Sequence, residues 1–194
     1  EEPWADPPPG RFLFEDVKYK LHACCHGTHA MIEALRAVPS VAPEAVKAVH
    51  LRVNPRWLRV CDLKAPRTGL EVKFSYGFLA AMVLHGIDTA AEAAYADALG
   101  SDRRLVDLAS RVTVAGDPAL GDTATEGRID LTDGGAIPIA HDLAAPLSPS
   151  VLEHGLRGKA RALLGTAAAD RLWTCVAGIE SHSARDLVSL LRAD

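Results

Sequence analysis

Residues 20–29, KLHACCHGTH, bring a lysine, two adjacent cysteines and three histidines into one short stretch. Three kinds of chemistry use these residue types. Histidines and cysteines bind zinc, a cysteine beside a histidine acts as a nucleophile, and a lysine beside a helix start binds an anion. Each demands a different local geometry, so the surrounding elements decide between them.

The metal interpretation requires three or four ligands arranged as a tetrahedron. His22, His26 and His29 would converge on one side of a continuous helix, but Gly27 interrupts the stretch. Neighbouring residues of a strand point to opposite faces, so Cys24 and Cys25 would not both reach one ion. Zinc is therefore the least favoured of the three interpretations, and we expect no metal site.

The thiol and anion interpretations both stay open. A nearby histidine or cation could activate Cys25 as a thiolate, although an unpaired cysteine is most often a small buried apolar residue. Lys20 and the Gly27-Thr28 turn would together offer a positive charge and free backbone N–H groups to a carboxylate. The alternative for Lys20 is an ordinary solvated lysine.

The elements that position this stretch follow from its periodicity. Alternation over residues 17–22 predicts a half-buried strand with Lys18, Lys20 and His22 on its polar face. Thr28 is a suitable N-cap for the helix that follows. The same reasoning predicts a strand at 49–53 that Asn54-Pro55 ends, with pairing continued at Leu58 and Val60.

Further along, a helix is predicted over 75–85 with Ser75 as its N-cap and Gly86 as its stop. The remaining elements are a helix near 90–99, a helix over 101–110, short strands at 112–114 and 129–131, the turn Asp133-Gly134-Gly135, and helices from Ser148 onward that break at Gly165 and Gly178. Strands and helices do not alternate strictly, so the sequence predicts an α+β fold: a small mixed sheet packed with helices, and a helical C-terminal segment.

Composition narrows the class of protein. The chain has 194 residues, 48% of them hydrophobic, and a net charge of −4, which argues against nucleic acid as a partner. No apolar run is long enough to cross a bilayer, and the four cysteines do not form a disulfide framework, so we expect a cytoplasmic protein without a membrane partner. Proline-rich residues 1–10 are expected to be a linker, or the point where a longer chain was cut, and residues 11–194 a single domain.

A second informative stretch is GLEVKFSYGFLAAMVLHG, residues 69–86. On its own it is an ordinary helix start. Together with Lys20, Cys25 and His29-Ala30-Met31-Ile32, it resembles the MmgE/PrpD family, whose patterns include a lysine, then a cysteine or histidine, then a histidine opening a helix, and K-F-S-x-x-Y. LSPSVLEHGLRGKARALLG, residues 147–165, resembles a third stretch of that family.

The resemblance implies the C-terminal α+β lid domain of a two-domain enzyme, with the N-terminal all-helical domain absent from this chain. The family includes 2-methylcitrate dehydratase, cis-aconitate decarboxylase and iminodisuccinate epimerase. It implies a cofactor-free hydro-lyase acting on a small di- or tricarboxylate, homodimeric as the full protein and inactive as this part alone. An epimerase, isomerase or decarboxylase of the same family is the alternative, and a non-catalytic carboxylate-binding module is the alternative from another class.

The resemblance also assigns roles to residues. Lys20, Cys25 and His26 are the expected catalytic residues. The expected substrate-binding residues are Lys20, Thr28, His29, Lys73 and Phe78. Phe78 stands where the family pattern has a tyrosine, and a phenyl ring cannot donate a proton or a hydrogen bond. That difference favours a reaction other than decarboxylation. No metal ion or iron–sulfur cluster is implied.

Overall fold

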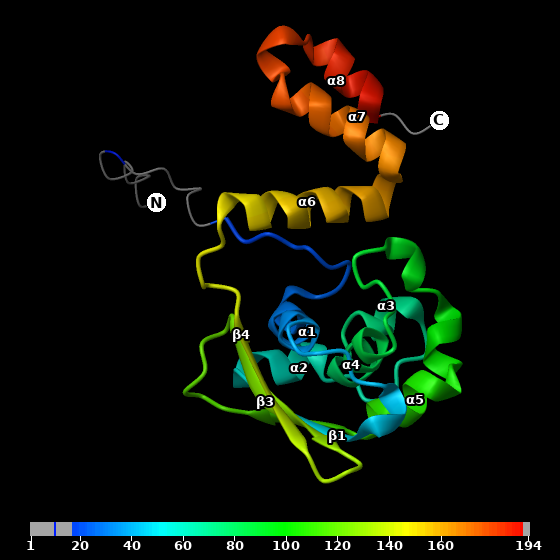
Figure 1. The fold of residues 1–194 in the computed structure, drawn as a ribbon. Helices are drawn as coiled ribbons and strands as arrows, with labels where there is room; N and C mark the ends of the chain where they lie inside the picture. Colours follow the sequence, from blue (N-terminus) through cyan, green and yellow to red (C-terminus); the bar gives the residue numbers. More distant parts are fainter. Residues whose placement is uncertain (1–9, 11–16, 192–194) are drawn as a thin grey trace, which may run out of the picture.

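A four-stranded mixed sheet forms one side of the molecule (Figure 1). The computed structural model describes residue 10 and residues 17–191. The strands are β1 (Val46–Val53), β2 (Val112–Gly116), β3 (Ala124–Leu131) and β4 (Ala136–Asp142), in the order β2-β1-β3-β4. β1 is parallel to β2, and the other two pairs are antiparallel. With the helices described below, this confirms the predicted α+β fold.

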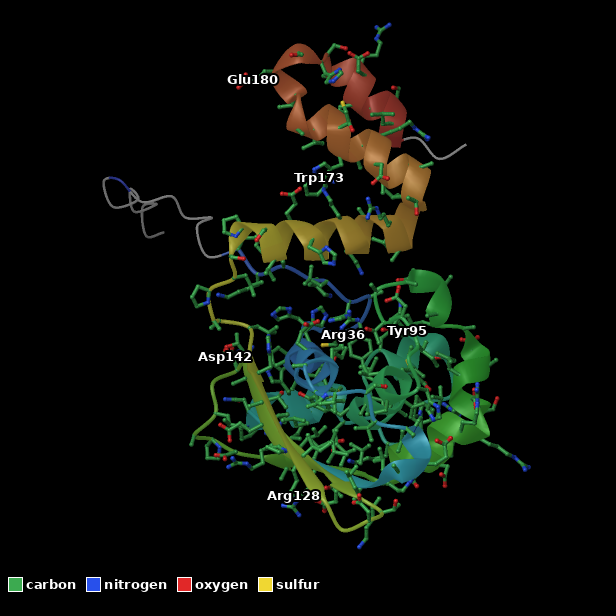
Figure 2. All side chains as sticks on the ribbon, viewed as in Figure 1. Arg36, Tyr95, Arg128, Asp142, Trp173 and Glu180 are labelled. Atoms are coloured by element: carbon green, nitrogen blue, oxygen red, sulfur yellow. The ribbon has the colours of Figure 1, made fainter. Side chains whose placement is uncertain are left out.

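Strand β1 lies between β2 and β3 in the sheet, and its residues alternate between buried and more exposed as predicted. Val49, Leu51 and Val53 are buried against the helices. His50 and Arg52 point to the opposite face, where His50 Nδ1 lies 2.8 Å from Thr113 Oγ1 of β2. Arg128 of β3 lies on this same outer side (Figure 2). The sheet therefore has one apolar face and one charged face.

Helices α1 (His29–Arg36) and α4 (Tyr76–Leu84) cover the apolar face, and α5 (Arg103–Ser110) packs on α4 (Figure 1). Helix α4 is apolar nearly all round, which is typical of a helix buried on all sides. The predicted stop and cap are confirmed: Ser75 Oγ accepts from the N–H of Phe78, and Gly86 has a φ of +71°. A positive φ costs glycine little, so the helix ends there.

Short elements connect these layers. They are α2 (Leu58–Cys61), α3 (Gly69–Val72) and 3₁₀ turns at His26–Thr28, Pro43–Ala45, Pro55–Trp57, Glu92–Ala94, Asp97–Ser101 and Ile179–Ser181. After Val53 the chain turns, with Asn54 accepting a hydrogen bond from the N–H of Arg56. The prediction that Leu58 and Val60 continue the strand pairing is therefore wrong, because this turn starts a helix.

The strand predicted over residues 17–22 is also wrong. These residues form no regular element. The segment passes beneath α6 (Pro149–Leu164) instead of joining a sheet edge (Figure 1). Leu21 packs against Gly155 of α6, where an added Cβ would lie 3.0 Å from Leu21 Cδ1. The alternation does not mark a buried face, because Val17 and Tyr19 are exposed and His22, expected on a polar face, is buried.

Two further differences have physical reasons. The helix predicted near 90–99 is only a pair of 3₁₀ turns, because the Tyr95 carbonyl lies against Gly69, and Asp97 accepts the Gly69 N–H at 2.8 Å. These long-range contacts override the local helical preference. The sequence did not predict strand β4, because Pro138 has no backbone N–H to donate to a neighbouring strand and so argues against a strand there. The proline is tolerated at this edge of the sheet, where it pairs with Arg128.

The C-terminal helices confirm the prediction for residues from Ser148 onward. α6 lies across the body, and α7 (Thr166–Ala177) and α8 (Ala184–Leu191) stack beyond it (Figure 1). Gly165, with φ +77°, separates α6 from α7. The guanidinium of Arg157 on α6 lies 4.5 Å from the ring centroid of Trp173 on α7. Trp173 is labelled in Figure 2.

Most of the expected linker lies outside the described residues, which include only Gly10 of that segment. Over the part of the chain that the structure covers, no helix is both long and apolar enough to cross a membrane.

Candidate functional site

Residues 20–29 form a tight turn that runs into α1. Cys25 precedes the 3₁₀ turn His26–Thr28, and α1 begins directly at His29. Thr28 is the residue before the helix, as predicted, but its side chain does not cap it. Its hydroxyl donates to the Cys25 carbonyl at 2.8 Å and lies 3.3 Å from Cys24 Sγ. Thr28 therefore closes the turn, which corrects the expected N-cap role.

The second sequence motif holds this turn in place. The Cys25 N–H donates to the Lys73 carbonyl at 3.1 Å. The hydroxyl of Tyr76, at the start of α4, donates to the Gly27 carbonyl at 2.8 Å. The indole of Trp57 lies so close to Gly27 that an added Cβ would be 2.4 Å from it. The two stretches singled out in the sequence are thus in direct contact.

Three histidines from this turn form a cluster. The ring centroids of His22 and His29 are 5.0 Å apart, and those of His26 and His29 are 5.1 Å apart. His22 is held at both nitrogens: Nε2 lies 2.6 Å from Glu33 Oε1, and Nδ1 lies 2.7 Å from Thr89 Oγ1. His22 is therefore a fixed buried group that packs edge-on against His29.

Burial lowers the pKa of two of the three histidines, His26 and His29. Desolvation, followed by the neighbouring histidines, lowers the pKa of His29 to about 3. Desolvation, followed by the positive charge of Lys20, lowers the pKa of His26. The hydrogen bond from His22 lowers the pKa of the Glu33 carboxyl. His29 is thus a neutral imidazole at physiological pH.

The two adjacent cysteines have different surroundings. Cys24 is buried and burial raises its pKa, so it is the small core residue considered above. Cys25 is half-buried. Desolvation and a side-chain hydrogen bond with Cys25 raise the pKa of Cys61. Cys61 is therefore a protonated thiol at physiological pH.

A cavity of about 350 Å³ opens beside the histidine cluster. His22, His26 and His29 line one side, and Val151 and Leu152 of α6 line another. The remaining lining residues include Lys18, Tyr19, Glu33, His141, Asp142 and Leu147. Two buried nitrogens of the cluster, His26 Nδ1 and His29 Nε2, have no hydrogen-bond partner among the residues that the structure describes. The cavity is thus part apolar and part imidazole-lined.

Two lysines act electrostatically on residues of the histidine turn without lining the cavity. Lys20 is exposed, forms no ion pair within residues 17–191, and its charge acts on both His26 and His29. Lys159 of α6 was not singled out from the sequence. Its ammonium donates to the Ala90 carbonyl at 3.2 Å, and burial and the charge of Lys20 lower its pKa. The resemblance at residues 147–165, which contain Lys159, was the signal that could have pointed to it.

Two expected binding residues lie elsewhere. The ammonium of Lys73 pairs with Glu92 and lies 5.0 Å from the centroid of the Tyr95 ring. Phe78 is buried in the hydrophobic core and does not line the cavity. Of the expected site residues, His26 and His29 line the cavity. Lys20, Cys25 and Thr28 belong to the same stretch of chain but are not among the lining residues, and neither are Lys73 and Phe78.

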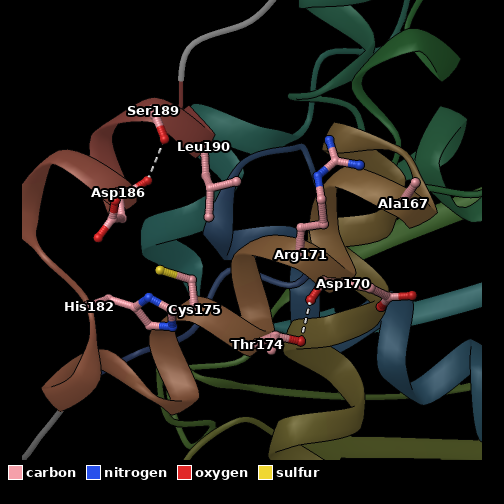
Figure 3. Close-up of a pocket in the computed structure, with 9 residues that line it drawn as sticks. All are labelled: Ala167, Asp170, Arg171, Thr174, Cys175, His182, Asp186, Ser189 and Leu190. Atoms are coloured by element: carbon pink, nitrogen blue, oxygen red, sulfur yellow. Dashed lines mark hydrogen bonds between the residues drawn. The ribbon is translucent and has the colours of Figure 1, made fainter.

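Among residues 17–191, no group of three or more histidine, cysteine, aspartate or glutamate side chains is arranged to hold a metal ion. A second hollow, of about 600 Å³, lies between α7 and α8 (Figure 3). Cys175, His182 and Asp186 line it. Its lining residues carry none of the unpartnered buried polar atoms found in the described chain. The histidine-lined cavity is therefore the better candidate site.

The structure thus combines an α+β domain with a small cavity lined partly by imidazoles, a shape typical of small-molecule sites. A family model, described as the MmgE/PrpD C-terminal domain, matches residues 22–179. The chain therefore belongs to the MmgE/PrpD family, which contains enzymes, and it corresponds to the C-terminal domain of that family. No curated protein matches the chain.

Proposed function

We propose that this domain forms one wall of the active site of a cofactor-free lyase that dehydrates a small di- or tricarboxylate. The observation that carries the proposal is the position of Lys20. It is a lysine without an ion-pair partner in the described chain, and its charge reaches the two histidines that border a cavity of about 350 Å³.

Cations are what such a reaction requires. Removal of a proton next to a carboxylate builds negative charge on that carboxylate, and a positioned positive charge stabilises it. Lys20 supplies this charge, and Lys159 adds a second cation from α6. The proposed role of Lys20 is to bind a substrate carboxylate and stabilise the developing enolate.

A proton acceptor and a proton donor complete the chemistry. Cys25 is half-buried and directly precedes the 3₁₀ turn that carries His26, and we assign it the role of the base. His26 is the proposed proton donor to the departing hydroxide. Its lowered pKa requires that it receive its proton as substrate binds, when the added negative charge stabilises the imidazolium.

The resemblance implies that an all-helical domain supplies the opposite wall of the site. We therefore expect weak binding and little turnover from residues 1–194 by themselves, and full activity, with dimer formation, only from the complete two-domain protein. An epimerase of the same family is the second candidate, because Phe78 lacks the hydroxyl of the family's tyrosine. A non-catalytic carboxylate-binding module is the third.

One assay separates these functions. The complete protein is incubated with 2-methylcitrate, citrate and other small polycarboxylates in D₂O. An unsaturated acid among the products supports the lyase. Deuterium uptake without an unsaturated product supports the epimerase, and binding without either supports the binding module.

The variant Lys20→Met tests the proposed role of Lys20 in the same assay. We expect it to lower kcat/KM by at least about 100-fold, the effect typical of losing one stabilising group at a developing charge. Lys47→Met is the matched control, because Lys47 is an exposed lysine on β1. Equal activity of the two variants would contradict the role assigned to Lys20.

A further inference from the structure

A large part of the histidine-lined cavity is apolar, and the proposed chemistry does not use it. Besides the imidazoles and Glu33, the lining includes Val17, Tyr19, Leu147 and Val151. A small polycarboxylate has little apolar surface with which to cover such residues. Another group is therefore expected to pack on this part of the cavity.

The four apolar side chains of that set are open to water. The exposed fractions of Val17, Tyr19, Leu147 and Val151 lie between 43% and 56%. They come from distant parts of the sequence, and the cavity gathers them into one surface, which we call the apolar wall. A gathered apolar surface rimmed by polar groups is typical of a place where another segment or molecule binds.

The chain carries a group of matching chemistry next to the apolar wall. Residues 11–16 lie outside the described part of the chain, and their sequence is RFLFED. Phe12, Leu13 and Phe14 supply three large apolar side chains in succession. Aromatic side chains bury more apolar area than most others, so they gain most from packing on an open apolar surface.

Chain length keeps these residues near the apolar wall. Phe14 precedes Val17 by three residues, so their Cα atoms lie within about 11 Å of each other, because one residue spans at most about 3.6 Å. Phe12 lies within about 18 Å of Val17 by the same reasoning. Val17 itself lines the cavity, so both phenyl rings have a high effective concentration beside it. A separate molecule would lose translational freedom on binding, and this tethered segment does not.

We propose that the apolar wall is the docking surface for Phe12-Leu13-Phe14, whose two phenyl rings pack on Leu147 and Val151. In this arrangement the segment covers the apolar part of the cavity, and the imidazoles remain for a polar ligand. The inference does not depend on the proposed function, because it concerns only contacts within the chain.

Labelling of an introduced cysteine measures whether the apolar wall is covered. Leu147 and Leu163 have the same exposed fraction, 49%, so cysteines at these two positions form a matched pair. Leu163 lies on α6 and does not line the cavity. The intact 194-residue chain with Leu147→Cys or Leu163→Cys is treated with N-ethylmaleimide. Mass spectrometry of its peptides separates the new cysteine from the four native ones.

The same two variants are then made in a chain that also carries Phe12→Ser and Phe14→Ser. Loss of the two rings should speed the labelling of Leu147→Cys at least about tenfold, because a covered site reacts only while it is open. The labelling rate of Leu163→Cys should be the same with and without the serine substitutions.

Equal labelling rates of Leu147→Cys with and without the serine substitutions would overturn the inference. Fast labelling in both would mean that the apolar wall is open to solvent, and slow labelling that rises on dilution would assign the wall to a second copy of the chain. If a variant fails to fold, shown by labelling of buried Cys61, nuclear Overhauser effects in the wild-type chain decide. Contacts from the ring protons of Phe12 or Phe14 to the methyl groups of Leu147 or Val151 support the inference, and their absence overturns it.

Discussion

His29 shows how a single residue's surroundings fix its chemistry. The same side chain at the surface would exchange protons near neutral pH, whereas burial beside two other imidazoles keeps it neutral. Its position in the sequence, as the first residue of a helix, is readable from KLHACCHGTH. Its neutrality is not, because it depends on His22 being buried, and the sequence pattern placed His22 on a polar face.

Acid should unfold the protein partly through this residue. The pKa of His29 is about 3 in the folded chain, below the ordinary value of 6.5. Since the unfolded state binds the proton more readily, stability present above pH 6.5 is lost as the pH falls from 6.5 toward 3. At about 1.4 kcal/mol per pH unit, the loss by pH 5 is about 2 kcal/mol.

Urea unfolding at pH 7 and pH 5 measures that loss. His29→Gln should lose about 2 kcal/mol less than the wild type between these pH values, and His182→Gln should match the wild type. An identical pH dependence in all three proteins would show that His29 is not held neutral.

Lys159 was missed because it reaches the site only through tertiary structure. It lies about 130 residues from the Lys20 turn in sequence, and α6 carries it there. Glu33 and Thr89, which hold His22, were missed for the same reason. Lys20, Cys25, His26, Thr28 and His29 were found together because they share one short stretch.

Replacing Lys159 should weaken carboxylate binding. Lys159→Met removes a cation whose charge reaches Lys20 and Cys24. We expect a three- to tenfold rise in the dissociation constant for citrate, about 1 kcal/mol, typical of a partly exposed charge. Lys64→Met, which removes an exposed lysine paired with Asp62, is the control. The same affinity in both variants would exclude a binding role for Lys159.

At the scale of elements, the sequence correctly predicted those helices and strands whose own residues carry the whole pattern. β1, α4 and α5 have complete patterns, and α5 begins after Asp102, whose side chain accepts from the N–H of Arg104. The strand predicted over residues 17–22 is absent, and its alternation is misleading because Val17 and Tyr19 are exposed while His22 is buried. The helix predicted near 90–99 is absent because the Tyr95 carbonyl packs closely against Gly69.

The 3₁₀ turn that carries His26 depends on the absence of a side chain at Gly27. A Cβ there would lie 2.4 Å from two atoms of the Trp57 indole, a rigid group. We expect Gly27→Ala to lower the free energy of unfolding by about 1–3 kcal/mol, as overpacking does. Because the turn must move, the citrate affinity should fall as well.

Gly158→Ala is the matched control for this variant. Gly158 lies within α6, and an added Cβ has no heavy atom within 4 Å. Alanine should there stabilise the helix by about 0.5–1 kcal/mol. Chemical denaturation measures the free energy of unfolding of both variants, which should fall for Gly27→Ala and rise for Gly158→Ala. A Gly27→Ala protein as stable as the wild type would show that Trp57 can move away.

At the scale of the whole molecule, the described chain divides into a well-buried body and an outer pair of helices. Many residues of β1 and α4 are fully buried, whereas α8 has no buried residue. α7 and α8 pack mainly on α6 and on each other. Stability is expected to follow this gradient, because local opening costs least where few apolar contacts break.

Hydrogen exchange of the intact chain tests the gradient. Amides of β1 and α4 should exchange at rates close to those of global unfolding, and amides of α8 should exchange at least about 100-fold faster. Added citrate should slow exchange in α1 and in the part of α6 that lines the cavity, while leaving α8 unchanged. Uniform protection across all these elements would contradict the division.

Pro138 affects how copies of this protein can associate. A sheet's outer strands offer unpaired backbone groups to which another chain can add. On the β4 side, Pro138 breaks the row of N–H donors, and on the other side β2 is only five residues long. Neither border is a good template for growth of the sheet from one molecule into the next. Association between copies is consequently expected to use helical surfaces, and fibril formation by sheet extension should be slow.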